Sequence, residues 1–466
     1  MRMTPNLQKL ISPGSIAVIG ATDQQDRIGH IIFENLKRSK IPLFPVHPRE
    51  KEVSGYTTYN DIEALPGDID LAIIAIGAKR AVAAAERCAK HGIPQIIVVA
   101  GGFSETGDEG KLLEDRLRMI PKKYGTRILG PNTLGLFVPH NNLDTIFVEH
   151  GDRSLSGGGG VAFISQSGSV GVEALGLASN TGYGMRAFIG LGNKCDLDEL
   201  DFLHHFGLDA ETTCLAFYLE TFDHGRKFLE QAKKIAAQKP VVVLKAGRSK
   251  AGASAVSSHT GRLAGSDQVV SGAFRQFGVQ RVFDDEELCD ASKTLSSLPP
   301  VFGNRVAILT PAGGYGVMGA DHIETPRGNV KLTMAVLSAV TQERIRSFSL
   351  PFASCSNPVD LTASADNKMM GNALDALLDD DNVDIIICTA FFAPPSITDG
   401  MVEEISLRAV GSKKPIIVFT QYGPFTDGYL RRFHDNGVIG FPSIGRTVRA
   451  TRFLVERAMI LKAIGT

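Results

Sequence analysis

Residues 15–20 read SIAVIG, and similar short apolar runs return at 42–46 (PLFPV), 70–76 (DLAIIAI) and 95–103 (QIIVVAGGF). Longer amphipathic segments separate these runs, the first of them over residues 28–39. Continuous apolar strands that alternate with helices are typical of a parallel sheet buried on both faces. The sequence therefore predicts a doubly wound α/β domain in the N-terminal part of the chain.

The same pattern begins twice more, with GVAFISQ at 160–166 and RVAILTP at 305–311. Four glycines at 157–160 precede the first restart, and SSLPPVFGN at 296–304 precedes the second. Stretches rich in Gly and Pro often mark domain boundaries. We therefore expect three successive doubly wound α/β domains, which cover residues 1–148, 149–298 and 299–466.

Composition argues against several classes of protein. The 466 residues carry 49 Lys and Arg against 50 Asp and Glu, so no overall field attracts nucleic acid or an acidic membrane. The six cysteines are scattered without a C-x-x-C pair, which favours reduced structural thiols, and we predict no metal site. The N-terminus does not resemble a signal peptide, and no run of about 18 apolar residues occurs. We expect a cytoplasmic protein that binds neither membrane nor nucleic acid.

Two strand-to-helix turns are built from small residues. The first is Ser165, Gln166, Ser167 and Gly168, and the second contains Gly313, Gly314 and Gly316. The free amides and positive dipole at a helix N-terminus stabilise an anion by up to ~2 kcal/mol. Each turn alone is ordinary in an α/β protein. Because the chain also carries His259 in a tract of small residues, described next, we predict that both turns bind phosphate.

His259 is the only group that titrates near neutral pH in the tract SKAGASAVSSHTGRLAG at 249–265, whose small residues predict a loop that bends easily. Glu220 follows the strand TCLAFYL, at the sheet edge where doubly wound folds bind ligands. We predict that Glu220 fixes the tautomer of His259 and leaves the other ring nitrogen as the nucleophile. An incidental histidine and a surface or capping glutamate are the plainer interpretations. Asp196, Asp198 and Glu199 resemble the acidic first turn of a helix, and we assign them no chemistry.

The first strand-to-helix turn, GATDQQDRIG at 20–29, lacks the G-x-G-x-x-G fingerprint, and no acidic residue for a ribose follows about 20 residues later. Instead Arg49 and Lys51 follow the second strand, which fits a ligand with a phosphate near its ribose better than NAD. A nicotinamide oxidoreductase therefore remains only an alternative hypothesis.

Eight motifs together resemble one family over essentially the whole chain. They are VIGAT (18–22), AGGFSETG (100–107), ILGPNTLGLF (128–137), ISQSGSVG (164–171), YLE ending at Glu220, the His259 tract, TPAGGYGVMGAD (310–321) and NPVDLTASAD (357–366). The sequence is similar to the α subunits of ADP-forming acyl-CoA synthetases, also called acetate–CoA ligases. That family is related to the succinyl-CoA synthetase α subunit.

The resemblance implies a Rossmann-like CoA-binding domain followed by two flavodoxin-like ligase domains. It implies reversible conversion of acyl-CoA, ADP and phosphate to a carboxylic acid, CoA and ATP, through an acyl phosphate and a phosphorylated His259 oriented by Glu220. The residues expected to bind CoA or acyl-CoA are Gly20, Ala21, Thr22, Val46, Pro48, Gly102, Phe103, Pro131 and Asn132.

One part of such an enzyme is missing from the sequence. No G-x-x-x-x-G-K-[ST] loop occurs, and three compact α/β domains leave no room for the ATP-grasp module that the family uses. The resemblance therefore implies that a separate ATP-grasp β subunit binds most of ADP or ATP with Mg²⁺, in an α2β2 assembly. A CoA-binding regulatory protein without turnover is the alternative. The sequence does not identify the acid.

Overall fold

The computed structural model describes residues 7–148, 158–181, 183–260, 266–326 and 328–465. The chain divides into two compact units. The first comprises Met1–Ser179 and Gly184–Leu288, and the second Asn180–Tyr183 and Cys289–Thr466. The α/β fold class with parallel sheets is confirmed in both units.

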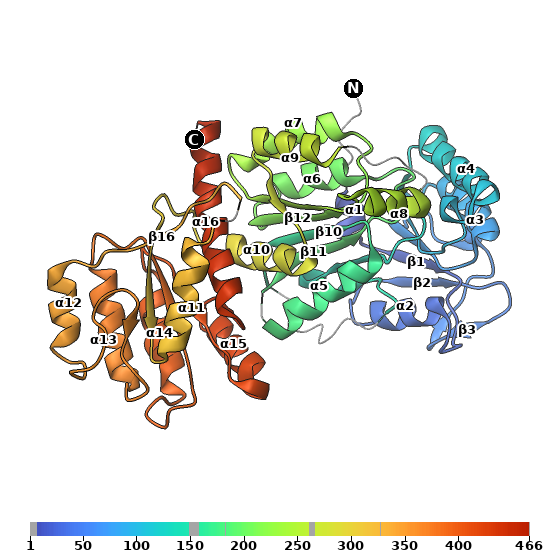
Figure 1. The fold of residues 1–466 in the computed structure, drawn as a ribbon. Helices are drawn as coiled ribbons and strands as arrows, with labels where there is room; N and C mark the ends of the chain where they lie inside the picture. Colours follow the sequence, from blue (N-terminus) through green and yellow to red (C-terminus); the bar gives the residue numbers. More distant parts are fainter. Residues whose placement is uncertain (1–6, 149–157, 182, 261–265, 327, 466) are drawn as a thin grey trace. The chain divides into compact units, whose positions relative to one another are not determined.

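The first unit begins with a five-stranded parallel sheet of order β2-β1-β5-β6-β7. Ile16 and Val18 of β1 lie in a core with α2, while Ala17 and Ile19 lie in a core with α3 and α4, so the sheet is buried on both faces. Figure 1 shows these helices and the sheet. The bounds are β1 Ile16–Ile19, β2 Leu43–Val46, β5 Leu71–Ile74, β6 Gln95–Val98, β7 Arg127–Leu129, α1 Gln8–Ile11, α2 Ile28–Leu36, α3 Ala78–Lys90 and α4 Asp108–Tyr124; β3 Glu52–Val53 pairs with β4 Tyr56–Thr57.

A seven-stranded sheet of order β14-β13-β12-β10-β11-β8-β9 completes the first unit. Five of its strands are parallel, whereas β8 and β9 are antiparallel. The bounds are β8 Leu136–Val138, β9 Leu143–Asp144, β10 Val161–Ser165, β11 Met185–Gly190, β12 Cys214–Leu219, β13 Val241–Lys245, β14 Gln280–Val282, α5 Gly168–Thr181, α6 Glu199–Leu208, α7 Gly225–Ala236, α8 Lys250–Thr260 and α9 Asp267–Gln276. Helix α10, Asp285–Ser297, begins in the first unit and belongs to the second from Cys289 on.

The chain passes from the first sheet to the second between β7 and β8, close to residue 130. This crossing comes earlier than the domain boundary expected at residue 148, because β8 and β9 add to the second sheet instead of the first. The glycine-rich stretch that suggested the boundary lies partly outside the described residues. The division into three domains stays a prediction.

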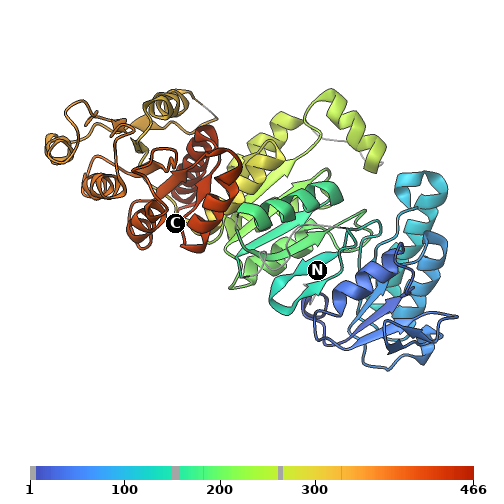
Figure 2. The same cartoon turned by 90° about the horizontal axis from the view of Figure 1, so that it is seen from below.

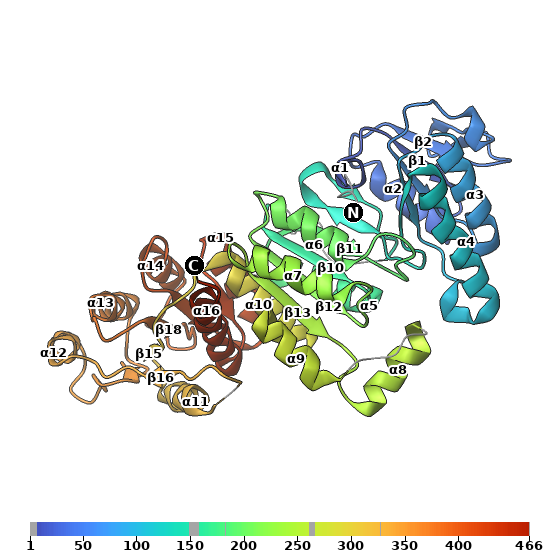
Figure 3. The ribbon, with the colours of Figure 1, turned by 90° about the horizontal axis from the view of Figure 1, so that it is seen from above.

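The tract around His259 differs from the expected loop, because residues 250–260 form helix α8. Three alanines favour the helix, and the Ser249 Oγ accepts a hydrogen bond from the Gly252 amide at 3.0 Å. Figures 2 and 3 both show α8 projecting from the body of the first unit. His259 lies in the last turn of this helix, and its side chain is outside the described residues.

The second unit holds a parallel six-stranded sheet, in which β16-β15-β18-β19-β20 lie in that order and β17 also pairs with β15. Its bounds are β15 Arg305–Thr310, β16 Thr333–Met334, β17 Val359–Asp360, β18 Ile385–Thr389, β19 Ile416–Phe419, β20 Gly440–Phe441, α11 Gly313–Glu324, α12 Ala339–Arg346, α13 Asn367–Leu378, α14 Gly400–Ala409, α15 Thr426–Asp435 and α16 Ile444–Ile464. Among the described helices none is long and apolar enough to cross a membrane.

Candidate active site

The residues predicted to bind CoA gather at one edge of the first sheet. They follow or end the parallel strands β1, β2, β6 and β7, so the fold brings four distant segments to the carboxyl ends of neighbouring strands. This is the edge where open parallel sheets bind their ligands. The segments are Gly20–Thr22, Val46–Pro48, Gly102–Phe103 and Pro131–Asn132.

The first of these turns depends on two glycines. Gly20 has φ +94°, and a Cβ on Gly29 would lie 2.0 Å from the Gly20 carbonyl oxygen. Only glycine at position 29 therefore lets α2 start against the turn. The Thr22 hydroxyl donates to Glu50 Oε1 at 2.8 Å, so the β1 turn is tied to the segment that follows β2.

The loop after β6 is held by carboxylates. The amides of Gly102 and Phe103 both donate to Glu105 Oε1, at 2.6 and 3.1 Å, and the Ser104 amide donates to Glu114 Oε2 at 3.3 Å. Burial opposes ionisation of Glu105, but hydrogen bonds from Asn193 and these backbone amides outweigh it and hold the pKa of Glu105 below its ordinary value. The Phe103 side chain is fully buried, so in this conformation neither its amide nor its ring is open to a ligand.

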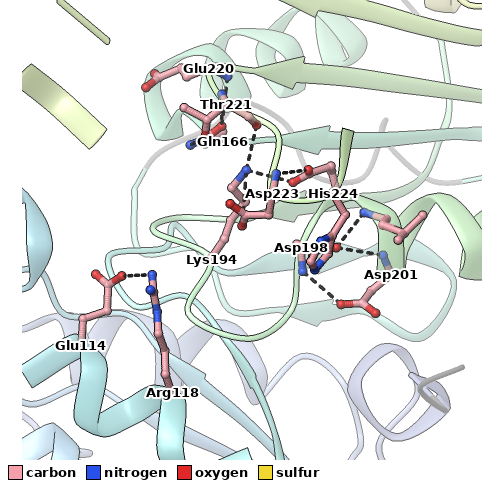
Figure 4. Close-up of polar contacts among 12 residues, drawn as sticks. Glu114, Arg118, Gln166, Lys194, Asp198, Asp201, Glu220, Thr221, Asp223 and His224 are labelled. Carbon is pink, nitrogen blue, oxygen red and sulfur yellow. Dashed lines mark hydrogen bonds and ion pairs between the residues drawn. The ribbon is translucent and has the colours of Figure 1, made fainter. Parts of the chain in front are cut away.

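At the carboxyl edge of the second sheet, the predicted turn lies beside Glu220. Ser165 pairs with Tyr218 in register, which places the end of β10 next to the end of β12. Gln166 Oε1 accepts the amides of Glu220 and Thr221 at 3.0 and 3.2 Å. The side-chain oxygen of Gln166 therefore holds the backbone of Glu220 and Thr221 (Figure 4), and its predicted role at a phosphate stays a prediction.

The other members of this turn are placed differently. The buried Ser165 hydroxyl donates to the Ser167 carbonyl at 2.6 Å, within the turn itself. The Ser167 and Ser169 hydroxyls lie 3.0 Å apart at the start of α5, beside the exposed Gly168. Exposed hydroxyls and amides at a helix N-terminus can bind an anion, so Ser167 and Gly168 are the accessible part of the predicted phosphate turn.

Glu220 is 6% exposed and lies in a mixed polar environment. Burial raises the pKa of Tyr218 to about 12, and the negative charge of Glu220 and a hydrogen bond to it contribute in the same direction. Burial lowers the pKa of Lys245, while the charge of Glu220 opposes that shift. Glu220 thus bonds to the Tyr218 hydroxyl of β12 and acts through its charge on Lys245 at the end of β13.

A buried lysine that sequence reasoning missed lies under the Glu220 turn. Lys194 has a fully buried side chain whose Nζ donates to Glu199 Oε2 at 2.9 Å and to the Thr221 carbonyl at 2.8 Å. In Figure 4 the Glu220 carboxylate points away from this lysine. The sequence could have indicated this lysine by its position, since Lys194 follows β11 at the same sheet edge as Glu220.

The acidic residues after Lys194 are structural, as expected. Asp198 caps α6, and its Oδ1 accepts the amides of Leu200 and Asp201 at 2.9 and 3.3 Å. Glu199 Oε1 accepts the Asp223 amide at 2.9 Å. Asp196 accepts the side chain of Arg127 at 2.7 Å. The predicted helix start is confirmed for Asp198 and Glu199, whereas Asp196 lies before the N-cap and pairs with Arg127 instead.

The helix that carries His259 belongs to the same unit as both sheet edges. Residues of α8 contact the short helix η2, Ser104–Thr106. This helix follows Gly102 and Phe103 in the loop after β6 that is predicted to bind CoA, here called the CoA loop. Most described side chains of α8 are exposed. The Val256 side chain is buried and packs against Gly247. The relation between the His259 ring and Glu220 stays a prediction.

In the second unit the predicted turn leads from β15 into α11. Gly313 and Gly316 are close to side chains, since a Cβ would lie 2.5 Å from Asp360 Oδ2 and 3.2 Å from Pro358 Cβ respectively. A Cβ on Gly314 would meet nothing within 4 Å. Gly314 is therefore the open position of this turn, while a side chain at position 313 or 316 would displace Asp360 or crowd Pro358. In the part of the chain that the structure describes, no group of His, Cys, Asp and Glu could hold a metal ion.

Family models match both halves of the first unit. A "CoA binding domain" model matches residues 14–139, and a "Succinyl-CoA ligase like flavodoxin domain" model matches residues 158–295. The α subunit of acetate–CoA ligase (ADP-forming) II from Pyrococcus furiosus is 36% identical, over 97% of this chain and 98% of the relative. Acetate–CoA ligase (ADP-forming) I from Archaeoglobus fulgidus is 34% identical, over 96% of this chain but 63% of the relative.

A solved structure agrees with these sequence matches. Acetyl-coenzyme A synthetase 1 of Ca. Korarchaeum cryptofilum, in complex with phosphate and ADP, superposes with a TM-score of 0.89 at 30% identity. The match covers 99% of this chain and 98% of that one. The fold is thus that of a CoA-dependent ligase subunit. The chain belongs to the family of the α subunits of ADP-forming acetate–CoA ligases, as its motifs predict, and the comparisons favour the ligase over a regulatory protein.

Proposed function

We propose that this chain is the acyl-transferring and phosphoryl-accepting subunit of an ADP-forming acyl-CoA synthetase. A phosphate oxygen attacks the thioester carbonyl, the C–S bond breaks, and acyl phosphate and CoA form. A ring nitrogen of His259 then attacks the phosphorus and the carboxylate leaves. Finally ADP takes the phosphoryl group from the P–N bond and ATP forms, so that each step also runs in reverse.

The observation that carries the proposal is the tie between the β10 turn and the Glu220 turn through Gln166. It places exposed donors at Ser167 and Gly168 on the same sheet edge as a carboxylate. In this assignment the donors stabilise the phosphoryl oxygens, and Glu220 accepts the proton of one imidazole nitrogen. Gly313, Gly314 and Gly316 are assigned to a second phosphate turn, of which Gly314 is the open position.

CoA is assigned to the carboxyl edge of the first sheet, where the predicted residues from Gly20 to Asn132 lie, although the Phe103 ring is buried and its amide bonded in this conformation. The hydrogen bonds of Glu105 to the Gly102 and Phe103 amides fit a preformed loop that presents its outer surface to the ligand. The three domains 1–148, 149–298 and 299–466 are retained as functional segments. The nucleotide and Mg²⁺ are assigned to an ATP-grasp partner subunit in an α2β2 enzyme of the cytoplasm.

Phosphorylation of the isolated chain tests this function. The full-length protein is incubated with acetyl phosphate, or with acetyl-CoA and inorganic phosphate, and its intact mass is measured. We expect the mass of one phosphoryl group, labile in acid and stable in base as a phosphohistidine is. The His259→Ala variant should bind CoA normally and gain no mass. An unmodified wild-type chain under both conditions, or a variant labelled as well as wild type, would refute the proposal.

A further inference from the structure

The turn after β11 bonds to both predicted binding edges of the first unit. Gly192 and Lys194 have φ +61° and +57°, and a Cβ on Gly192 would lie 2.3 Å from the Pro131 carbonyl oxygen. The Asn193 amide donates to that carbonyl at 2.9 Å. Left-handed backbone at two of three residues reverses the chain sharply, so that Asn193 and Lys194 can bond to different partners.

Asn193 bonds to the loop at the first sheet. Its Nδ2 donates to Glu105 Oε2 at 2.6 Å and to Glu114 Oε2 at 2.9 Å, the two carboxylates that hold the backbone of residues 102–104. Its Oδ1 accepts the Asn132 side chain at 3.2 Å. One amide side chain therefore bonds to both carboxylates and to Asn132, and it acts on Gly102 and Phe103 through Glu105. Hydrogen bonds to charged acceptors are stronger than neutral ones.

Lys194 bonds to the turn at the second sheet. Its buried ammonium donates to the Thr221 carbonyl, directly after Glu220, and pairs with Glu199. Figure 4 shows Lys194 beneath Glu220 and Thr221. A buried ammonium with a fixed carboxylate partner and a fixed carbonyl acceptor restricts the backbone that it bonds.

We propose that Asn193 and Lys194 are positioning residues that hold the CoA loop and the Glu220 turn in register with one another. This inference rests on the proposed function, because it assigns acyl transfer to the first edge and phosphoryl transfer to the second. Neither side chain touches the reacting atoms in this assignment. Asn193 acts through Glu105 and Glu114, and Lys194 acts through Thr221.

Two half-reactions separate the two roles. The variants are Asn193→Ala, and Lys194→Met combined with Glu199→Gln so that neither charge of the pair is left buried alone. Calorimetry gives the Kd of CoA, and intact mass gives the rate of phosphorylation by acetyl phosphate, which involves no CoA. Asn436→Ala, at an exposed site of the second unit, is the matched control.

For Asn193→Ala we expect the Kd of CoA to rise about tenfold with phosphorylation by acetyl phosphate within about twofold of wild type. For the double variant we expect the converse, a phosphorylation rate lowered about tenfold or more and an unchanged Kd. Thermal unfolding must be cooperative in each protein. If the double variant does not fold, the Lys194→Arg variant replaces it. Because arginine keeps the charge, a folded Lys194→Arg protein should retain more of the phosphorylation rate than a misfolded protein would.

The outcomes distinguish this inference from the proposed function. A wild-type chain that is not phosphorylated refutes the function itself. If the wild type is phosphorylated but the folded variants match it in both assays, the positioning roles are refuted and the function is not. The same holds if the folded variants lose both activities equally. Opposite losses in the two variants support both.

Discussion

Glu220 shows how the fold prepares one residue for chemistry. Its backbone amide is held by Gln166, the next carbonyl is held by Lys194, and its side chain shares a buried region with Tyr218. The backbone is therefore fixed from two sides, and the carboxylate is buried beside the Tyr218 hydroxyl. A carboxylate in such a place can stabilise an imidazole that gains positive character as it is phosphorylated.

Glu220→Gln should slow phosphoryl transfer without unfolding the protein. Glutamine keeps the size and the acceptor oxygen but removes the charge, so we expect the rate of phosphorylation by acetyl phosphate to fall at least about tenfold, with unchanged CoA affinity. Rapid quench with intact mass measures the rate. Glu211→Gln, at an exposed position, is the control. Wild-type kinetics in Glu220→Gln would make the residue merely structural.

At the residue scale, sequence and structure agree where position along a strand decides the matter. Glu220, Gly168 and Asn132 could be placed at sheet edges because each follows an apolar strand. The roles of Gln166 and Asn193 could not be predicted, because their partners lie far along the chain; Asn193 and Glu105 are 88 residues apart. Pattern identifies the edge on which a side chain lies, but long-range packing decides what it bonds.

At the scale of elements, helix α4 supports the CoA loop by close approach. Gly110 lies in its first turn, where a Cβ would be 1.8 Å from the Phe103 carbonyl oxygen and 2.4 Å from the Thr106 hydroxyl. Phe103 belongs to the segment that the Glu105 and Glu114 carboxylates hold, and the Thr106 hydroxyl donates to the Phe103 carbonyl at 2.8 Å. The loop can therefore keep its conformation only while position 110 has no side chain.

Gly110→Ala should displace this loop. We expect about 1 to 3 kcal/mol of lost stability from overpacking, and a Kd for CoA raised about tenfold, measured by denaturant unfolding and calorimetry. Gly272→Ala is a matched control within α9, where a Cβ would meet nothing within 4 Å, and should leave CoA binding unchanged. Equal CoA affinity in both variants would argue that the loop does not contact CoA.

Some helices and strands could not be predicted from composition and periodicity. The Gly, Ala and Ser content of residues 249–265 suggested a loop, yet alanine is the best helix former and Ser249 supplies an N-terminal hydrogen bond, so α8 is a helix through Thr260. The short strands β8 and β9 were missed because they carry little periodicity and are defined by pairing with β11. Long apolar strands, in contrast, were predicted correctly.

At the scale of the whole molecule, the chain carries the acyl and phosphoryl sites that we propose and no recognised nucleotide motif. Its sequence has no G-x-x-x-x-G-K-[ST] loop. The Pyrococcus furiosus α subunit has nearly the same extent, whereas the chain covers only 63% of the Archaeoglobus fulgidus ligase. The remainder of that longer relative is the natural candidate for what a partner subunit supplies.

The chain alone should therefore accept a phosphoryl group and fail to pass it on. Once phosphorylated by acetyl phosphate and freed of reagent, it should keep its label when ADP and Mg²⁺ are added, because in our proposal the partner subunit binds ADP and brings its β-phosphate into line with the P–N bond. Addition of the nucleotide-binding subunit should release the label as ATP, detected by chromatography. The same mixture made with His259→Ala should form no ATP. Rapid ATP formation by the purified chain without a partner would show that the nucleotide site lies within this polypeptide. The assignment of that site to a partner subunit would then be wrong.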